Sequence, residues 1–347
     1  MTGPLRGSLP VDPERRTRLL AAKLRALLKR HWPDAGRGEP VGAAGGVAVQ
    51  QGSWAWILAD GDATQGFARA LLWALHRRVA ELHVLADAGP ALVAAARQAV
   101  CFRTSITVWA IDGTELATVD PAPLPPEPPL DPDAEPFVSV IEAAGAEAVI
   151  EWGILTAEVL GLEVARVHAD EDGARLEVGL GEHDRLINRM AWGDLPPAQA
   201  LARIVEVATA ARRSGDLTHP LNSLGRERWL RHRLVHDPSP LGVRSLRPVS
   251  PPRPRTDLTT PLLAPASGRG HDGPAVLAAC SVAFDPTFVP MAAELHGART
   301  QSGSSEHLLL VLPEGDLHPL IQLAADDLIV VPAIRTVRRD WYAERSR

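Results

Sequence analysis

The sequence predicts an α/β protein: two βαβαβ units with parallel strands flank a central α+β region that contains a β-hairpin. Strand-like apolar runs alternate with helical patterns near both ends of the chain, which predicts the two outer units. Two alternating stretches around the acidic turn 170–173 predict the central hairpin. With 347 residues the chain is long enough for two or three domains.

Residues 12–31 predict an amphipathic helix with Asp12 as its N-cap and Pro13 in its first turn. Leucines at helical spacing form its apolar side, and seven basic residues against two acidic ones give a net charge of +5. The helix either docks on the protein body with a solvated charged side or contacts an anionic partner. Charged helix faces usually serve solubility, which favours the first interpretation.

The first βαβαβ unit follows this helix. Its predicted elements are a strand or hairpin at 47–60, a helix at 65–79, a strand at 81–87, a helix at 90–100 and a strand at 105–111. Asp60, Asp62 and Asp87 come at strand ends, where parallel sheets place ligands, although acids there are commonly loop or N-cap residues.

The second βαβαβ unit lies near the end of the chain. Its predicted elements are strands at 275–285, 307–316 and 329–333 and helices at 287–296 and 318–328. Proline-rich stretches suggest where the parts join. The predicted division is residues 1–119 for the basic helix with the first unit, 120–136 for a Pro-rich linker, 137–240 for the central domain, 241–274 for a Pro/Arg-rich linker and 275–347 for the C-terminal unit.

In the central domain the pattern predicts a helix over 137–160, followed by the hairpin strands 162–168 and 174–180. A helix over 197–212 and a short basic helix over 222–235 complete it.

Charge is strongly segregated along the chain. Eighteen acidic residues but only Arg166 and Arg175 lie between residues 112 and 184, whereas residues 212–255 carry ten arginines against three acids. Either the basic segments pair with the acidic region of the same chain, or they face an external polyanion beside a divalent cation held by the acids. The first account needs no partner and is therefore favoured.

Carboxylates of the central domain are the candidate metal ligands. Glu158 near the end of the predicted helix, Glu163 on the first hairpin strand and Glu177 on the second could converge to bind Mg²⁺. A helix followed by an acidic hairpin, over residues 139–190, resembles the core of PD-(D/E)XK nucleases. That resemblance implies Mg²⁺-dependent phosphodiester cleavage.

The resemblance lacks one part of the family's motif, the lysine two positions after the acid. Ala165 follows Glu163, Gly179 follows Glu177, and the region contains no lysine. Strand alternation also predicts that Arg166 points away from Glu163. The missing lysine leaves open whether such a domain is active.

The short basic helix is the candidate nucleic-acid contact. Arg226, Arg228, Arg231 and Arg233 surround Trp229, which could stack on a base or anchor the helix. The leading hypothesis is thus a nucleic-acid-associated protein with a nuclease-like central domain, active or inactive. The alternative is a non-catalytic α/β scaffold or regulatory protein that binds a protein partner or a small ligand.

Cys101 and Cys280 lie far apart in apolar runs, which predicts buried, reduced thiols. The chain begins without the apolar core of a signal peptide, and no run reaches the length of a membrane span. The expected location is the cytoplasm, without a membrane partner. The chain is rich in Ala, Arg, Gly and Pro and contains two lysines. This amino-acid composition is typical of proteins encoded by high-GC bacterial genomes.

Overall fold

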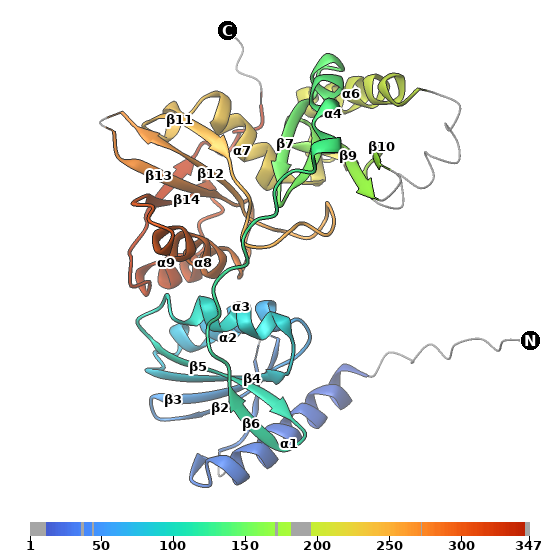
Figure 1. Cartoon of the computed structure of the whole chain (residues 1–347). Coiled ribbons are helices and arrows are strands. Elements are labelled where there is room, and N and C mark those ends of the chain that lie inside the picture. The colour runs from blue at the N-terminus through green and yellow to red at the C-terminus, as the bar shows by residue number, and fades with distance from the viewer. Residues whose placement is uncertain are drawn as a thin grey trace, which may run out of the picture. The chain divides into compact units, whose positions relative to one another are not determined.

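The computed structural model describes residues 12–35, 38–43, 45–170, 173–181, 196–271 and 273–343. These residues form three β-sheets with helices packed on them, which confirms the predicted α/β class (Figure 1). The chain divides into two compact units. The first contains residues 1–122 and 327–329, and the second contains residues 123–326 and 330–347.

The first unit has a six-stranded sheet. Its strands, in sheet order, are β1 (Val41–Ala43), β2 (Gly46–Gln51), β3 (Trp54–Ala59), β4 (Glu81–Asp87), β5 (Ser105–Asp112) and β6 (Glu115–Thr118). Strands β3, β4 and β5 are parallel, joined by helices α2 (Ala63–His76) and α3 (Pro90–Ala99), as the βαβαβ pattern predicts. Strands β2 and β3 form the hairpin predicted around Gly52.

Helix α1 (Pro13–His31) covers one face of this sheet, and α2 and α3 cover the other (Figure 1). The backbone N–H of Glu14 donates to the Asp12 side chain at 3.4 Å, in the predicted N-cap position. Leu24, Leu27 and Leu28 are buried in a cluster with β2 and β3 residues. The docking of α1 on the protein body is therefore confirmed, and its contact with an anionic partner stays a prediction.

The second unit begins with an antiparallel four-stranded sheet. Its strands are β7 (Glu147–Glu151), β8 (Ile154–Val159), β9 (Leu162–Asp170) and β10 (Gly173–Val178), in the order β10-β9-β8-β7. The 3₁₀ turn η2 (Pro132–Ala134) and helices α4 (Pro136–Ala143) and α6 (Pro197–Ser214) pack with it. The hairpin of β9 and β10 is the predicted one, although residues 171 and 172 of its turn lie outside the described residues.

The helix predicted over 137–160 is wrong beyond residue 143. Residues 147–159 form the hairpin of β7 and β8 instead, so Glu158 lies on a strand. The cause is the turn at Trp152-Gly153, where both residues have positive φ (55° and 68°). Two successive positive φ values characterise the tight turns that join antiparallel strands.

The second unit also contains a five-stranded sheet. Its strands, in sheet order, are β11 (Val243–Pro248), β12 (Ala264–Gly270), β13 (Ala275–Cys280), β14 (His307–Pro313) and β15 (Ala333–Val337). Helices α8 (Phe288–Gln301) and α9 (Pro319–Asp326) connect the parallel strands β13, β14 and β15 in the predicted order. The strand predicted at 329–333 is wrong over residues 329–332, because β15 begins at Ala333. The stretch 241–274, expected to be a linker, instead contributes β11 and β12, which pair antiparallel.

Helix α7 (Arg226–His236) connects the two sheets of the second unit. It follows the turn η3 (Pro220–Ser223) and precedes η4 (Ser239–Leu241). Trp229, Leu230 and Leu234 are buried in the core of the five-stranded sheet. Residues on the other side of the helix face the four-stranded sheet, as described below.

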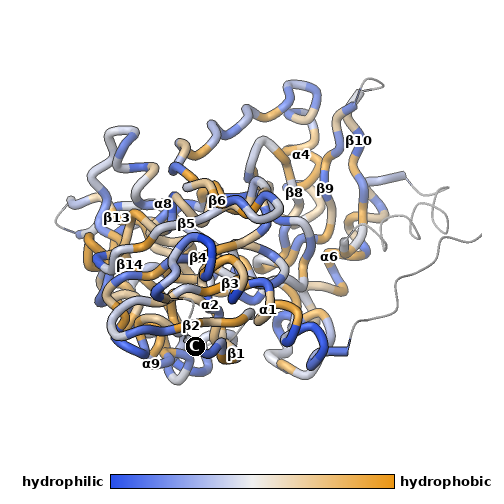
Figure 2. The backbone as a smooth tube through the Cα atoms, turned by 90° about the horizontal axis from the view of Figure 1, so that it is seen from below, coloured by the Kyte–Doolittle hydropathy of each residue, from blue (hydrophilic) through white to orange (hydrophobic). Residues whose placement is uncertain are grey.

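Apolar residues concentrate in the strands and hydrophilic residues in the connecting loops (Figure 2). Cys280 is fully buried and free, as predicted, and burial raises the pKa of its thiol to about 12. Cys101 is only partly buried, which corrects the expectation for that residue. No helix within the described part of the chain is long and apolar enough to span a bilayer.

The turn between β8 and β9 touches the backbone of α7, so a side chain added in this turn should destabilise the fold. Leu160 and Gly161 have φ values of 47° and 76°, and a Cβ on Gly161 would lie 2.4 Å from the carbonyl carbon of Arg228. Gly161→Ala should therefore strain the turn and also push α7 away from the sheet.

Gly113→Ala is the matched control, because Gly113 has a similar φ of 60° but open space where its Cβ would lie. In chemical denaturation Gly113→Ala should cost about 1 kcal/mol from backbone strain alone. Gly161→Ala should cost about 1–3 kcal/mol more, from overpacking. Equal losses for the two variants would contradict the contact with α7.

Candidate functional site

The three carboxylates predicted to bind Mg²⁺ share one face of the four-stranded sheet. Glu158 lies opposite Glu163, and Arg166 lies opposite Glu177. The register between β8 and β9 shifts by one residue at this point, which is a β-bulge. The bulge places Glu163 and Arg166 on the same face, where a regular strand would separate them. The expectation that Arg166 points away from Glu163 is therefore wrong.

Glu158 and Glu163 are buried and bound to arginine. Their side chains are 3% and 1% exposed, and like charges directly opposite each other in a sheet repel. The Arg228 guanidinium lies between them, with one nitrogen 2.9 Å from Glu158 Oε1 and 3.3 Å from Glu163 Oε2. Arg166 donates two further hydrogen bonds to Glu163, at 3.0 and 3.2 Å.

Glu151 extends this network from β7. It accepts a hydrogen bond from Arg231 and a second one, at 3.3 Å, from Nε of Arg255. Arg231 also lies 3.5 Å from Glu158, which links the two carboxylates. Burial alone would raise the pKa of Glu151, but Arg231, Arg255 and Arg228 outweigh it and lower that pKa from 4.5 to about 2.

Because of these ion pairs, the carboxylate oxygens are already occupied and are poorly available to a magnesium ion. Glu158 and Glu163 are held by guanidinium groups in a dry interior, and Glu177 accepts a hydrogen bond from Arg175 at 3.1 Å. A metal would have to displace those cations from carboxylates that they already neutralise. The glutamates of this face thus form a structural contact with arginine side chains.

The predicted nucleic-acid residues of α7 are internal as well. Arg228 and Arg231 are only 2% and 1% exposed, and Trp229 packs edge-on against Trp341 with ring centroids 5.3 Å apart. Arg233 is half-buried and donates to a backbone carbonyl at residue 343. Arg226 is also half-buried. For α7, the account in which basic residues pair with the acidic region of the same chain is confirmed.

Helix α1 divides its basic residues into two groups. Three of them bind acids of the first unit. Arg16 binds Asp60 with two hydrogen bonds of 2.6 Å, Lys23 binds Asp87 at 2.7 Å, and Arg30 binds Glu115. Asp62 caps α2 by accepting from the Gln65 backbone at 2.9 Å. The strand-end acids are therefore structural.

The second group points to solvent. Arg15, Arg18, Arg25 and Lys29 are exposed, and none of the four has an ion pair with another described residue. Their spacings of three, seven and four residues place them on one side of the helix. At 1.5 Å per residue the row is about 21 Å long. We call these four residues the basic row.

A tryptophan-lined cavity lies at the end of α1. Trp32 follows the helix, and with Trp54 and Trp56 of β3 it lines a cavity of about 470 Å³ together with His31 and Gln51. Trp56 is buried, Trp32 is half-buried and Trp54 is 44% exposed. The ring centroids of Trp32 and Trp54 lie 6.0 and 6.1 Å from that of Trp56. The cavity therefore offers exposed aromatic surface on a buried base.

His83 and Trp109 support these rings from behind. His83 stacks on Trp56 at 5.4 Å with an interplanar angle of 17°. Burial lowers the pKa of His83 although Glu81 acts in the opposite direction, so the imidazole is neutral and accepts from Trp109 Nε1 at 3.2 Å. The sequence analysis did not identify this cluster. Two features of the sequence could have indicated it. Trp54 and Trp56 are two residues apart and so share one face of a strand, and Trp32 directly follows the basic helix.

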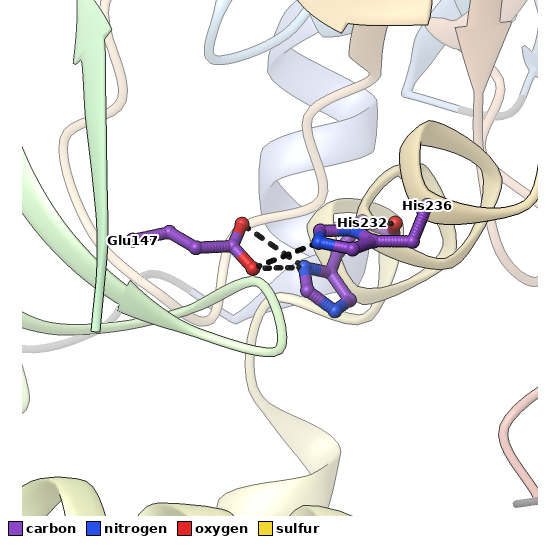
Figure 3. A group of neighbouring side chains, drawn as sticks. All are labelled: Glu147, His232 and His236. Carbon is purple, nitrogen blue, oxygen red and sulfur yellow. Dashed lines mark hydrogen bonds and ion pairs between the residues drawn. The ribbon is translucent and has the colours of Figure 1, made fainter. Parts of the chain in front are cut away.

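A third group has metal-binding chemistry. Glu147 of β7 and His232 and His236 of α7 offer ligand atoms that all lie within 4.8 Å of one another. Both imidazoles point toward the Glu147 carboxylate (Figure 3). The sequence analysis missed this group because it expected Glu147 on a helix.

Comparison of the chain with protein-family models, with curated proteins and with solved structures found no match. The candidate sites therefore have to be judged on their own geometry.

The buried network predicts a large effect for one substitution. Arg228→Ala would leave Glu158 and Glu163 opposed without their shared cation, and removal of one partner of a buried pair costs about 3–5 kcal/mol. Arg244→Ala, at an exposed residue of β11, should change the free energy of unfolding by less than about 0.5 kcal/mol. Chemical denaturation measures both, and similar losses would show that the network contributes little.

The lowered pKa of Glu151 predicts acid sensitivity. A carboxyl whose pKa is lower in the folded state stabilises the protein fully above its ordinary pKa of 4.5, and this contribution is lost as the pH falls toward 2. The difference corresponds to about 3 kcal/mol. Glu151→Gln should flatten the fall of unfolding free energy between pH 4.5 and 2, whereas Glu142→Gln, at an exposed residue of α4, should leave it unchanged.

Proposed function

We propose that the protein binds single-stranded nucleic acid on its first compact unit, through the basic row of α1 and the tryptophan-lined cavity at the end of that helix. The observation that carries this proposal is the continuity of the two features along one helix. Four exposed cations lead to Trp32, which lines the cavity together with the exposed ring of Trp54.

The chemistry of the surface favours an unpaired strand. Proteins that bind single strands combine cations along the phosphate backbone with aromatic rings on which bases stack. Bases in a duplex are already stacked and do not offer their faces to tryptophan. The cavity also contains His31 and the Gln51 amide, which can hydrogen-bond to base edges.

The split of the basic residues of α1 supports a role for the basic row. Arg16, Lys23 and Arg30 suffice to hold the helix against acids of its own unit. The basic row has no such acids among the described residues, and so its field is available to an anionic partner. The proposed contact with nucleic acid thus lies on α1 and not on α7. The proposed function does not include cleavage of the strand, because Glu158 and Glu163 are bound to arginine.

The test is fluorescence anisotropy with a labelled single-stranded oligonucleotide, measured at several salt concentrations. Replacing all four residues of the basic row with Gln should weaken binding and flatten its salt dependence by up to about 3 units, since single strands contribute about 0.7 per phosphate contact. Arg244→Gln with Arg269→Gln is the control, because both residues are exposed on the five-stranded sheet. These two changes should leave the salt dependence intact.

A second variant separates stacking from charge. Trp54→Ala should weaken binding by about 1–3 kcal/mol without changing the salt dependence, and Trp54→Phe should restore part of the loss. Wild-type protein that ignores single strands at low salt would refute the proposal. That outcome would favour the alternative of a scaffold or regulatory protein, with the cavity binding another ligand.

A further inference from the structure

The group formed by Glu147, His232 and His236 lies in the second unit and is independent of the proposed nucleic-acid surface. His232 and His236 are one turn apart on α7, so their rings lie on the same side of the helix, with centroids 4.2 Å apart. Glu147 opposes them from the edge strand β7 (Figure 3).

The two separations between Glu147 and the histidines are close to those of ligands around one metal ion. Glu147 Oε1 lies 3.0 Å from His232 Nδ1 and 3.5 Å from His236 Nε2. Two ligand atoms at 2.0–2.1 Å from a tetrahedral zinc ion lie about 3.4 Å apart. Only small side-chain shifts are therefore needed to admit the ion.

Hydrogen bonds also orient the rings for binding. The His232 carbonyl oxygen accepts from His236 Nδ1 at 3.0 Å, so Nδ1 carries the proton and Nε2 is the nitrogen directed at Glu147. A backbone carbonyl that fixes the second nitrogen is the usual support of a metal-binding histidine.

Both histidines line a cavity of about 980 Å³. Three arginines and two aspartates also line it, and Trp341 contributes apolar surface. The charged residues are Arg213, Arg233, Asp237, Arg338 and Asp340. Arg338 is partly neutralised by Asp340, at 2.6 Å. Three protein ligands leave one position open on a four-coordinate ion, and an ion bound here would have that position beside a cavity rich in guanidinium groups.

We propose that Glu147, His232 and His236 bind a divalent transition metal, with Zn²⁺ as the best fit, and that a small anion completes its coordination from the arginine-lined cavity. Two imidazoles favour zinc over magnesium or calcium, which prefer oxygen ligands throughout. One carboxylate leaves the zinc site with a positive charge, and the three arginines of the cavity outnumber its two aspartates. An anionic fourth ligand such as phosphate or a carboxylate is therefore favoured.

The test uses the full-length, metal-free protein titrated with Co²⁺, a spectroscopic substitute for zinc. One equivalent should produce the intense visible absorption of a low-coordinate site, and Zn²⁺ should abolish it. His236→Ala and Glu147→Gln should each weaken binding by about 10-fold or more. The His236 side chain is 57% exposed, so its removal should leave the fold intact, which thermal denaturation checks.

His307→Ala is the control, because His307 is exposed at the start of β14 and should not affect the titration. The proposed site would be refuted if the wild type does not bind the metal, or if it binds no more tightly than the two ligand variants. The anion is tested separately by adding inorganic phosphate to the Co²⁺ form. A spectral change that Arg233→Gln diminishes supports the cavity as the source of the fourth ligand, and an unchanged spectrum overturns that part.

Discussion

The second unit depends on the contact between the Arg228 guanidinium and the opposed carboxylates of Glu158 and Glu163. Without Arg228, two glutamates directly across a buried antiparallel pair would repel, and Glu158 would lose its 2.9 Å hydrogen bond. Arg228 supplies both needs because α7 is held against the sheet at the turn of Gly161. The sheet therefore requires the helix, and the helix requires a glycine in that turn.

Helix α7 satisfies two very different surfaces at once. One side places Leu230 and Leu234 in the apolar core of the five-stranded sheet, and the other places Arg228 and Arg231 among carboxylates. Such a helix does not show one apolar side and one charged side that is fully solvated. Arg228 and Arg231 look like surface residues in the sequence, although they are among the most buried side chains of the described residues.

This is why sequence reasoning identified the outer units well and the centre poorly. In the outer units strands such as β3 and β14 are almost continuous apolar runs, so local pattern and tertiary environment agree. In the centre the turns are Trp152-Gly153 and Leu160-Gly161, in which the first residue is not the expected Asn or Asp. The excess of acids suggested a solvated or metal-binding surface, since pairing across 70 residues leaves no local signal.

The separation between the partners of the network has a consequence for biosynthesis. Glu158 and Glu163 precede Arg228 by 70 and 65 residues, so the hairpin strands leave the ribosome well before their cation is made. During that interval the two carboxylates can remain hydrated only if this face of the sheet stays open to water. The second unit can thus finish folding only after α7 has left the ribosome. A chain that stalls before residue 228 leaves the acidic face of this sheet uncovered.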